Sequence, residues 1–151
     1  MDESLRDLYQ EVILDHSRRP RHFGALAGAT HRGEGYNPLC GDRVTVYLHV
    51  DGMGRIADVS FEGRGCAISQ ASASLMTDLV LGRTVADADT LMGGFLHLVK
   101  GEGANGLAPG DRETLDVMSG ISAFPMRVKC ATLAWHTMKS ALEGGASAKT
   151  E

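Results

Sequence analysis

Three cysteines and one aspartate carry the chemistry that this sequence suggests. Cys40 and Asp42 stand two residues apart in one short segment, whereas Cys66 and Cys130 lie far downstream. The chain has no other cysteine, so the thiols are inert core residues, metal ligands or a nucleophile. Cys40 follows Asn-Pro-Leu on a turn and Cys66 follows Gly-Arg-Gly, and neither context is typical of a core thiol. This context favours a metal site.

Zinc prefers four ligands drawn from Cys, His and Asp or Glu. The candidate set is Cys40, Asp42, Cys66 and Cys130. Their spacing alone is a weak signal, because there is no Cys-x-x-Cys pair, and three buried structural cysteines stay an open alternative. Histidines compete for the fourth place, among them His49, His97 and His136. The carboxylate of Asp42 is favoured because it lies on the same turn as the first thiol.

Two segments with alternating apolar residues predict a β-hairpin before the second cysteine. Residues 44–50 alternate apolar and polar side chains, and Asp51–Gly54 has the composition of a turn. Residues 56–62 form the return strand, with Ala57, Val59 and Phe61 expected on one face. A third strand is expected from residues 36–37 or from the stretch after them. The glycine-rich stretch 18–42 lacks the pattern of a phosphate-binding loop. It is interpreted as an extended, turn-rich segment that leads to Cys40.

Apolar residues at helical spacing predict five helices. Their expected ranges are Ser4–Ser17, Cys66 to about Gly82, Asp87–Lys100, Glu113–Met118 and Pro125–Leu142. Ser4 is the expected N-cap of the first. Cys66 begins the second helix, where the free N–H groups and the dipole favour a thiolate, and Cys130 lies inside the last. Residues 1–143 are expected to form one domain, and residues 144–151 a disordered tail.

Composition and charge exclude several classes of protein. With 151 residues, 43% hydrophobic and 23% charged, the chain is globular and long enough for one domain. A net charge of −4 gives no basic field for nucleic acid, and no apolar run reaches the roughly 20 residues of a membrane helix. The acidic N-terminus does not resemble a signal peptide, which predicts a cytoplasmic protein. A cluster with Arg18, Arg19 and Arg21 is interpreted as a solvated helix end rather than as a docking site.

The three cysteine motifs resemble those of the IscU/NifU-N family of iron–sulfur cluster assembly proteins. The motifs are Asn37–Asp42, Gly63–Ser69 and Arg127–Leu133, and residues 8–9 and 15–21 resemble the family's N-terminal region. The match covers residues 5 to 142. It implies an α+β fold in which a small three-stranded antiparallel sheet packs against about five helices.

Three departures resemble the SufU branch of this family. Lys129 stands where the housekeeping branch has a histidine before its third cysteine, residues 123–129 differ from the Leu-Pro-Pro-Val-Lys motif, and residues 101–118 form an additional segment. The resemblance implies a zinc-dependent sulfur acceptor that activates a SufS-type cysteine desulfurase and supplies downstream iron–sulfur assembly proteins. It implies Cys40, Asp42, Cys66 and Cys130 as zinc ligands.

Cys40 is the expected sulfur acceptor. Its turn is flanked by glycine and can move, whereas Cys66 and Cys130 are anchored on helices. The desulfurase would use pyridoxal phosphate to leave a persulfide on its own cysteine, which the acceptor thiolate attacks. One alternative is a scaffold on which the same cysteines hold a transient [2Fe–2S] cluster, since thiolates suit iron as well as zinc. Another is an adaptor in which zinc only supports the fold.

Overall fold

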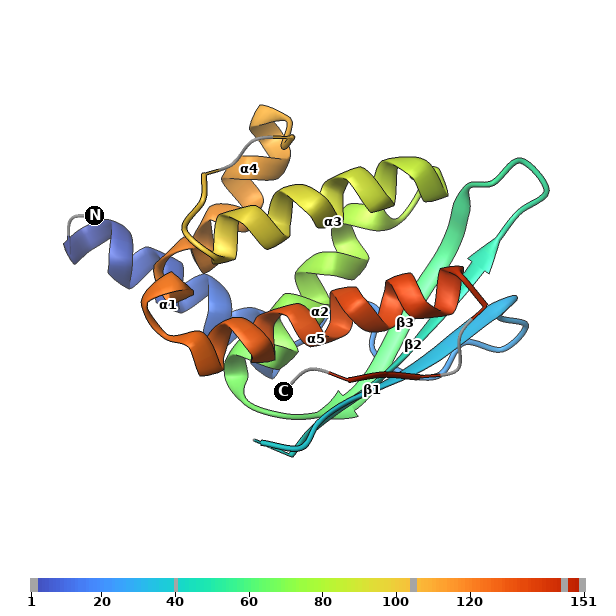
Figure 1. The fold of residues 1–151 in the computed structure, drawn as a ribbon, viewed down its shortest axis with the longest axis horizontal. Coiled ribbons are helices and arrows are strands. Elements are labelled where there is room, and N and C mark those ends of the chain that lie inside the picture. Colours follow the sequence, from blue (N-terminus) through green and yellow to red (C-terminus); the bar gives the residue numbers. More distant parts are fainter. Residues whose placement is uncertain (1–2, 40, 104–105, 145–146, 150–151) are drawn as a thin grey trace.

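Helices cover one face of a small sheet in the computed structural model, which describes residues 3–39, 41–103, 106–144 and 147–149 (Figure 1). The elements in chain order are α1 (Glu3–Arg18), β1 (His31–Asn37), β2 (Asp42–Val50), β3 (Ile56–Arg64), α2 (Ala67–Val80), α3 (Val85–Val99), α4 (Pro109–Leu115), the 3₁₀ helix η1 (Asp116–Ala123), α5 (Pro125–Leu142) and β4 (Ser147–Lys149). The predicted α+β fold, with three antiparallel strands and five α-helices, is confirmed. None of the helices in the described ranges is both long and apolar enough to cross a membrane.

The strand order is β3-β2-β1-β4, and β2 pairs antiparallel with both of its neighbours. The predicted hairpin is therefore confirmed. A third strand is present as expected, but β1 begins at His31, five residues before the expected position. The prediction for Ala57 is wrong, because its side chain is exposed while Val59 and Phe61 are buried. The register shifts next to His49, where Val50 pairs with Ile56 and His49 pairs with Asp58. Ala57 is the extra residue at this irregularity and leaves the alternation.

The C-terminal segment differs from the expected disordered tail. Ser147–Lys149 forms β4, which pairs in parallel with Glu34–Tyr36 on the outer edge of β1. An edge strand offers unpaired backbone N–H and C=O groups, and a short segment can use them without any side-chain pattern. The sheet thus gains a fourth strand for which the sequence carries no signal.

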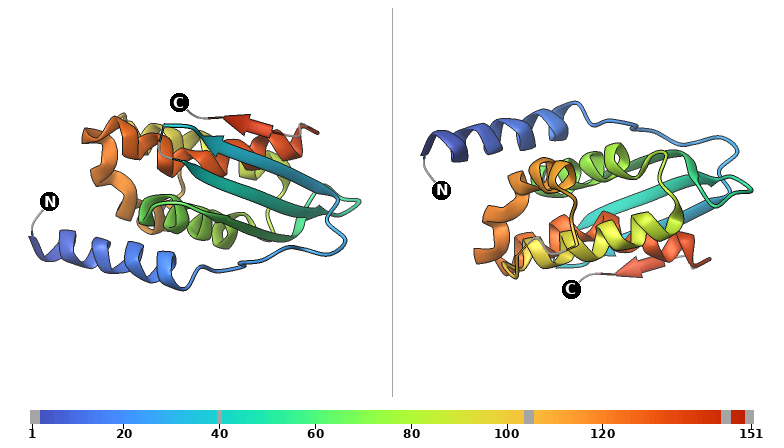
Figure 2. Two further views of the ribbon diagram at one scale, coloured as in Figure 1. Left: turned by 90° about the horizontal axis from the view of Figure 1, so that it is seen from below. Right: turned by 90° about the horizontal axis from the view of Figure 1, so that it is seen from above.

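Helix α5 lies close against β1, because two glycines of that strand face it. A Cβ atom at Gly33 would lie 2.9 Å from the carbonyl oxygen of Thr137, and one at Gly35 would overlap the Thr137 hydroxyl. Figure 2 shows α5 lying along the sheet. The missing side chains allow α5 to lie near enough to the sheet to bring Cys130 toward its end.

Replacing Gly35 with alanine should lower the free energy of unfolding by about 2 kcal/mol or more, because overpacking of an interior commonly costs about 1–3 kcal/mol. The new methyl group would collide with the side chain of Thr137 and would lie 3.1 Å from the Leu133 side chain, both on α5. Urea-induced unfolding measures the effect. The matched control is Gly52→Ala on the β2–β3 turn, where nothing lies within 4 Å of the new Cβ. Equal stability of the two variants would contradict the close packing.

A buried polar link ties α2 to α5 near two of the cysteines. The Ser72 hydroxyl donates to the carbonyl oxygen of Ala131 (2.5 Å) and accepts from the Trp135 indole N–H (3.0 Å). The Trp135 ring stacks on Phe95 of α3 at a centroid distance of 4.6 Å. Ala131 follows Cys130 directly, so this link sets the position of that cysteine relative to α2.

Helix α1 packs on α2 through a histidine that is 8% exposed. The Nδ1 atom of His16 lies 2.7 Å from the Ser74 hydroxyl, which also accepts from the backbone N–H of Arg21. The helix begins at Glu3, so Ser4 lies inside it and the prediction that Ser4 caps it is wrong. The predicted end of this helix before Pro20 is confirmed.

The protein should lose stability as the pH falls below about 6.5, the ordinary value for histidine. Burial, and then the positive charge of Arg21, lowers the pKa of His16. Below the ordinary pKa the unfolded chain therefore binds more protons than the folded chain, and unfolding is favoured. Burial also lowers the pKa of His136. Thermal unfolding across this range should show a smaller loss in His16→Gln than in the parent, and the smallest loss in the double variant with His136→Gln. An unchanged profile in both variants would contradict the assignment.

Candidate metal centre

Three metal-ligating groups from different parts of the chain meet at one end of the sheet. They are the carboxylate of Asp42 at the start of β2, the thiol of Cys66 before α2 and the thiol of Cys130 in α5. One ligand atom of each lies within 4.8 Å of the other two. The structure thus brings together three of the four side chains singled out in the sequence, although 24 and 64 residues separate consecutive members.

Asp42 is 2% exposed and is held next to Cys66 by the backbone. Its Oδ1 atom accepts from the Cys66 backbone N–H at 3.2 Å, and its Oδ2 atom lies 4.0 Å from the Cys66 sulfur. A Cβ atom at Gly65 would lie 2.6 Å from Oδ1. Glycine at position 65 is therefore what leaves room for this carboxylate.

Cys66 is the N-cap of α2, in agreement with the expectation that it begins a helix. Its backbone is extended, and its sulfur accepts a hydrogen bond from the N–H of Ser69 at 3.4 Å. A thiol at this position satisfies one of the free N–H groups of the first helical turn. Cys66 is partly exposed and so reachable from outside.

Cys130 lies in the second turn of α5 and is 1% exposed. A helix that packs on β1, β2 and α2 carries it. Asp42 and Cys130 therefore form the buried side of the group, and Cys66 forms its accessible side. All three positions are set by regular secondary structure, which keeps them in place.

Cys40 lies outside the described residues, but the turn that contains it is held from both sides. Asn37 and Asp42 are paired residues of β1 and β2. The side-chain oxygen of Asn37 accepts from the Leu39 N–H (3.0 Å), and its carbonyl oxygen accepts from the Gly41 N–H (2.8 Å). Gly41 has a φ of +75°, which glycine adopts without strain. The Leu39 side chain, directly before Cys40 in the chain, is exposed.

The donor set suits zinc. Two sulfurs and one oxygen match its preference, and ligand atoms around one zinc ion lie about 3.5–3.8 Å apart when bond lengths are about 2.0–2.3 Å. Since the observed separations are at most 4.8 Å, zinc binding would require the ligand atoms to move together by about 1.3 Å at most. The buried Asp42 carboxylate makes no ion pair with a cationic side chain among the described residues. A cation would compensate its charge.

The histidines weighed as ligands lie elsewhere. His49 faces the backbone oxygen of Gly28, and His97 pairs with Glu102 at 2.8 Å. Across the described ranges the metal-ligating group contains no histidine.

The basic cluster at the end of α1 is partly neutralised within the chain, because Asp15 pairs with Arg19 (3.4 Å) and Arg21 (2.7 Å).

Two residues that shape this site were not identified from the sequence. Gly65 leaves the space for Asp42, and Asn37 closes the turn before it. Their positions inside the Gly-Arg-Gly-Cys and Asn-Pro-Leu-Cys segments were the available signal. A glycine between a strand and a helix indicates that another group lies close to its backbone. The sequence does not show which group this is, because Asp42 belongs to another strand.

The chain matches the family model described as "NifU-like N terminal domain" over residues 8–101. It is 38% identical over 145 residues to the "Iron-sulfur cluster assembly scaffold protein IscU" of Streptococcus pyogenes serotype M1, a match that covers 96% of this chain and 89% of that protein. It is also 38% identical over 146 residues to the "Zinc-dependent sulfurtransferase SufU" of Bacillus subtilis, covering 94% and 96%.

The fold agrees with a solved relative. The crystal structure of a nitrogen-fixing NifU-like protein (N-terminal) from Brucella abortus superimposes with a TM-score of 0.79 at 26% identity. This match covers 92% of the present chain and 94% of the other. Similarity therefore extends well beyond the three cysteine motifs.

Proposed function

We infer that this chain, which belongs to the NifU-like N-terminal domain family, is a zinc-dependent sulfur acceptor in iron–sulfur cluster assembly. It would take persulfide sulfur from a SufS-type cysteine desulfurase. The observation that carries this proposal is the convergence of Asp42, Cys66 and Cys130 beside the turn of a third cysteine. The Bacillus subtilis relative named a zinc-dependent sulfurtransferase supports it over nearly the full length of both chains.

Asp42, Cys66 and Cys130 would hold zinc together with Cys40. When bound, zinc keeps sulfur ligands ionised at neutral pH and undergoes no redox change of its own. The three described residues are anchored by a strand and two helices, whereas Cys40 belongs to the short connection between β1 and β2. The anchored groups would therefore retain the ion while Cys40 reacts, and an Asp ligand fits such a labile site better than a closed structural one.

The thiolate of Cys40 would attack the outer sulfur of the partner's persulfide. The sulfur–sulfur bond of the persulfide breaks, the partner's cysteine leaves as a thiolate, and a new sulfur–sulfur bond forms on Cys40. The transferred sulfur carries its oxidation state with it, so no external oxidant or reductant is needed. The exposed turn at Leu39 and the partly exposed Cys66 leave this side of the site open to a partner.

The second candidate function is a scaffold for a transient [2Fe–2S] cluster. It is favoured by the Streptococcus pyogenes relative, which is named a scaffold protein, and by the ability of thiolates to bind iron. Lys129 next to Cys130 argues against it, because the resembled housekeeping branch has a histidine there. In this alternative the iron–sulfur cluster is the cargo of the protein.

Mapping of the transferred sulfur tests the proposal. The zinc-loaded protein is incubated with the desulfurase of its own organism and ³⁵S-labelled cysteine, and thiols are alkylated before digestion. We expect one extra sulfur atom on the peptide that contains Cys40 and none on those with Cys66 or Cys130. Labelling of the desulfurase without transfer to this chain would contradict the proposal.

A further inference from the structure

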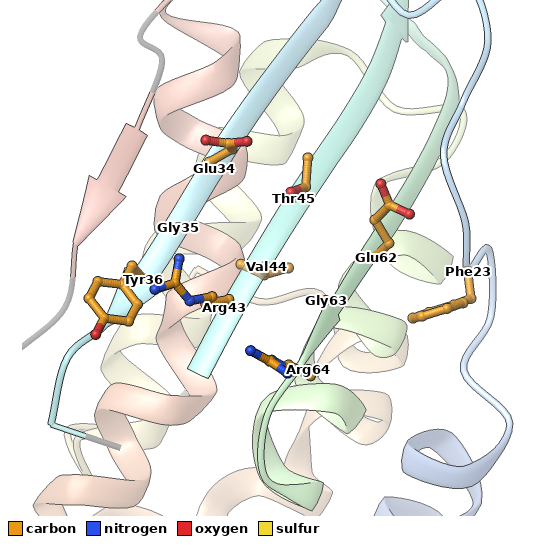
Figure 3. Close-up of a pocket in the computed structure, with 10 residues that line it drawn as sticks. All are labelled: Phe23, Glu34, Gly35, Tyr36, Arg43, Val44, Thr45, Glu62, Gly63 and Arg64. Atoms are coloured by element: carbon orange, nitrogen blue, oxygen red, sulfur yellow. The ribbon is translucent and has the colours of Figure 1, made fainter. Parts of the chain in front are cut away.

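A second feature lies on the opposite face of the sheet from the helices. A pocket of about 600 Å³ opens there, at the same end of the sheet as the metal-ligating group. Figure 3 shows its lining by Tyr36, Arg43, Glu34, Glu62, Arg64 and Phe23, which come from the three antiparallel strands and from the segment before β1. No described helix lies across this face in Figure 2. The proposed sulfur transfer assigns no role to it.

Two arginines give this pocket its charge. Arg43 and Arg64 are direct partners on the paired strands β2 and β3, and both are exposed. The Arg43 guanidinium stacks on Tyr36, 4.5 Å from the ring centre. This contact holds one of the two cations in place on the surface.

The two carboxylates that line the pocket interact with residues other than Arg43 and Arg64. Glu34 pairs with Arg32 at 2.8 Å, and Glu62 accepts a hydrogen bond from the Tyr47 hydroxyl. Among the described residues, neither Arg43 nor Arg64 forms an ion pair with a carboxylate. Within the described ranges, this end of the sheet therefore presents two guanidinium groups without a carboxylate partner, in a chain whose net charge is −4.

The two cations flank the candidate metal centre in the chain. Arg43 follows Asp42, and Arg64 lies two residues before Cys66. Neighbouring residues of a strand point to opposite faces, so the buried Asp42 carboxylate and the exposed Arg43 guanidinium lie on opposite sides of the sheet end. A molecule bound in the pocket would therefore lie on the other side of the sheet end from the metal-ligating group.

We propose that this pocket docks an acidic segment of the cysteine desulfurase, with its Asp or Glu side chains on Arg43 and Arg64. The inference rests on the proposed function, which requires a protein partner to approach this end of the sheet. A guanidinium group binds carboxylates with two parallel hydrogen bonds. Because the net charge of the chain is negative, two adjacent guanidinium groups form a local positive patch that would attract an acidic segment. The half-exposed Phe23 ring provides an apolar wall beside it.

The test reverses the two charges and measures how much of this protein half-maximally stimulates the desulfurase. In Arg43→Glu/Arg64→Glu we expect that concentration to rise by about tenfold, since charges at the rim of an interface govern association. The maximal stimulated rate should stay unchanged. Added salt should weaken the parent more than this variant. Zinc content and thermal unfolding show whether each variant is intact, and Arg43→Gln/Arg64→Gln, with a smaller rise expected, serves if the reversal does not fold.

The matched control is Arg55→Glu/Arg112→Glu, which makes the same change in net charge. Arg55 directly precedes β3 at the other end of the hairpin, and Arg112 lies on α4; neither residue lines the pocket. We expect no rise in this control. An unchanged value in the pocket variants, or an equal rise in the control, would overturn the docking site while leaving sulfur transfer intact. Failure of the parent itself to stimulate the desulfurase would overturn both proposals.

Discussion

Replacing Cys40 with alanine should abolish stimulation of the desulfurase, with a loss of about 100-fold or more, because covalent transfer needs a nucleophile. The two other thiols cannot substitute for it. Cys130 is 1% exposed, and the Cys66 sulfur accepts an N–H at the start of α2. The measurement is the rate of alanine formation from cysteine at saturating concentrations of the variant.

The matched control is Leu39→Ala on the same turn. The Leu39 side chain is exposed, and the hydrogen bond to Asn37 uses only its backbone N–H. We expect this variant to retain stimulation to within a few-fold of the parent. Zinc content measured for both variants separates loss of the nucleophile from loss of the metal. Full stimulation by Cys40→Ala would refute the assignment of the acceptor.

Loss of Asp42 should weaken zinc binding by about 100-fold or more, since even changes to groups behind a ligand cost about 10- to 100-fold. The carboxylate is buried, and it is the group's only oxygen ligand among the described residues. Competition with a chelator measures the zinc affinity of Asp42→Ala. The control is Asp58→Ala, an exposed aspartate on β3. Unchanged affinity would show that another residue is the ligand.

Gly65→Ala tests the same carboxylate without removing a ligand. The new Cβ would lie 2.6 Å from Oδ1 and 2.8 Å from Cγ of Asp42, so the side chain has to move. We expect this variant to bind zinc more weakly than the parent, as Asp42→Ala should, although all the proposed ligands are still present. Parent-like affinity would mean that the position of this carboxylate does not matter for binding.

The spacing of apolar residues and the turn composition predicted the strands and helices that depend mainly on neighbouring residues. Alternation along residues 44–50 and a turn at Asp51–Gly54 specify a hairpin, and β2 and β3 follow it. Pro125 opens α5 and Leu142 ends it, as expected from helical periodicity. The error at Ala57 falls where long-range contacts decide. Ala57 is exposed because of a register shift between strands.

The candidate site shows the same division. That Cys66 begins a helix follows from the preceding Gly-Arg-Gly segment and the apolar spacing after it. That Asp42, Cys66 and Cys130 meet could not be derived from their spacing, since β2, α2 and α5 are brought together by packing over the whole domain. The expectation came from the resemblance to a family. The clearance at Gly65 and the link from Ser72 to Ala131 became visible only in three dimensions.

The most direct test of the account compares desulfurase turnover with the zinc-loaded and the metal-stripped protein. We predict stimulation by the zinc-loaded form, none by the stripped form, and recovery when zinc is added back. The absence of stimulation by either form, together with a stable iron–sulfur chromophore after reconstitution with iron and sulfide, would contradict zinc-dependent sulfur transfer and support the scaffold function instead.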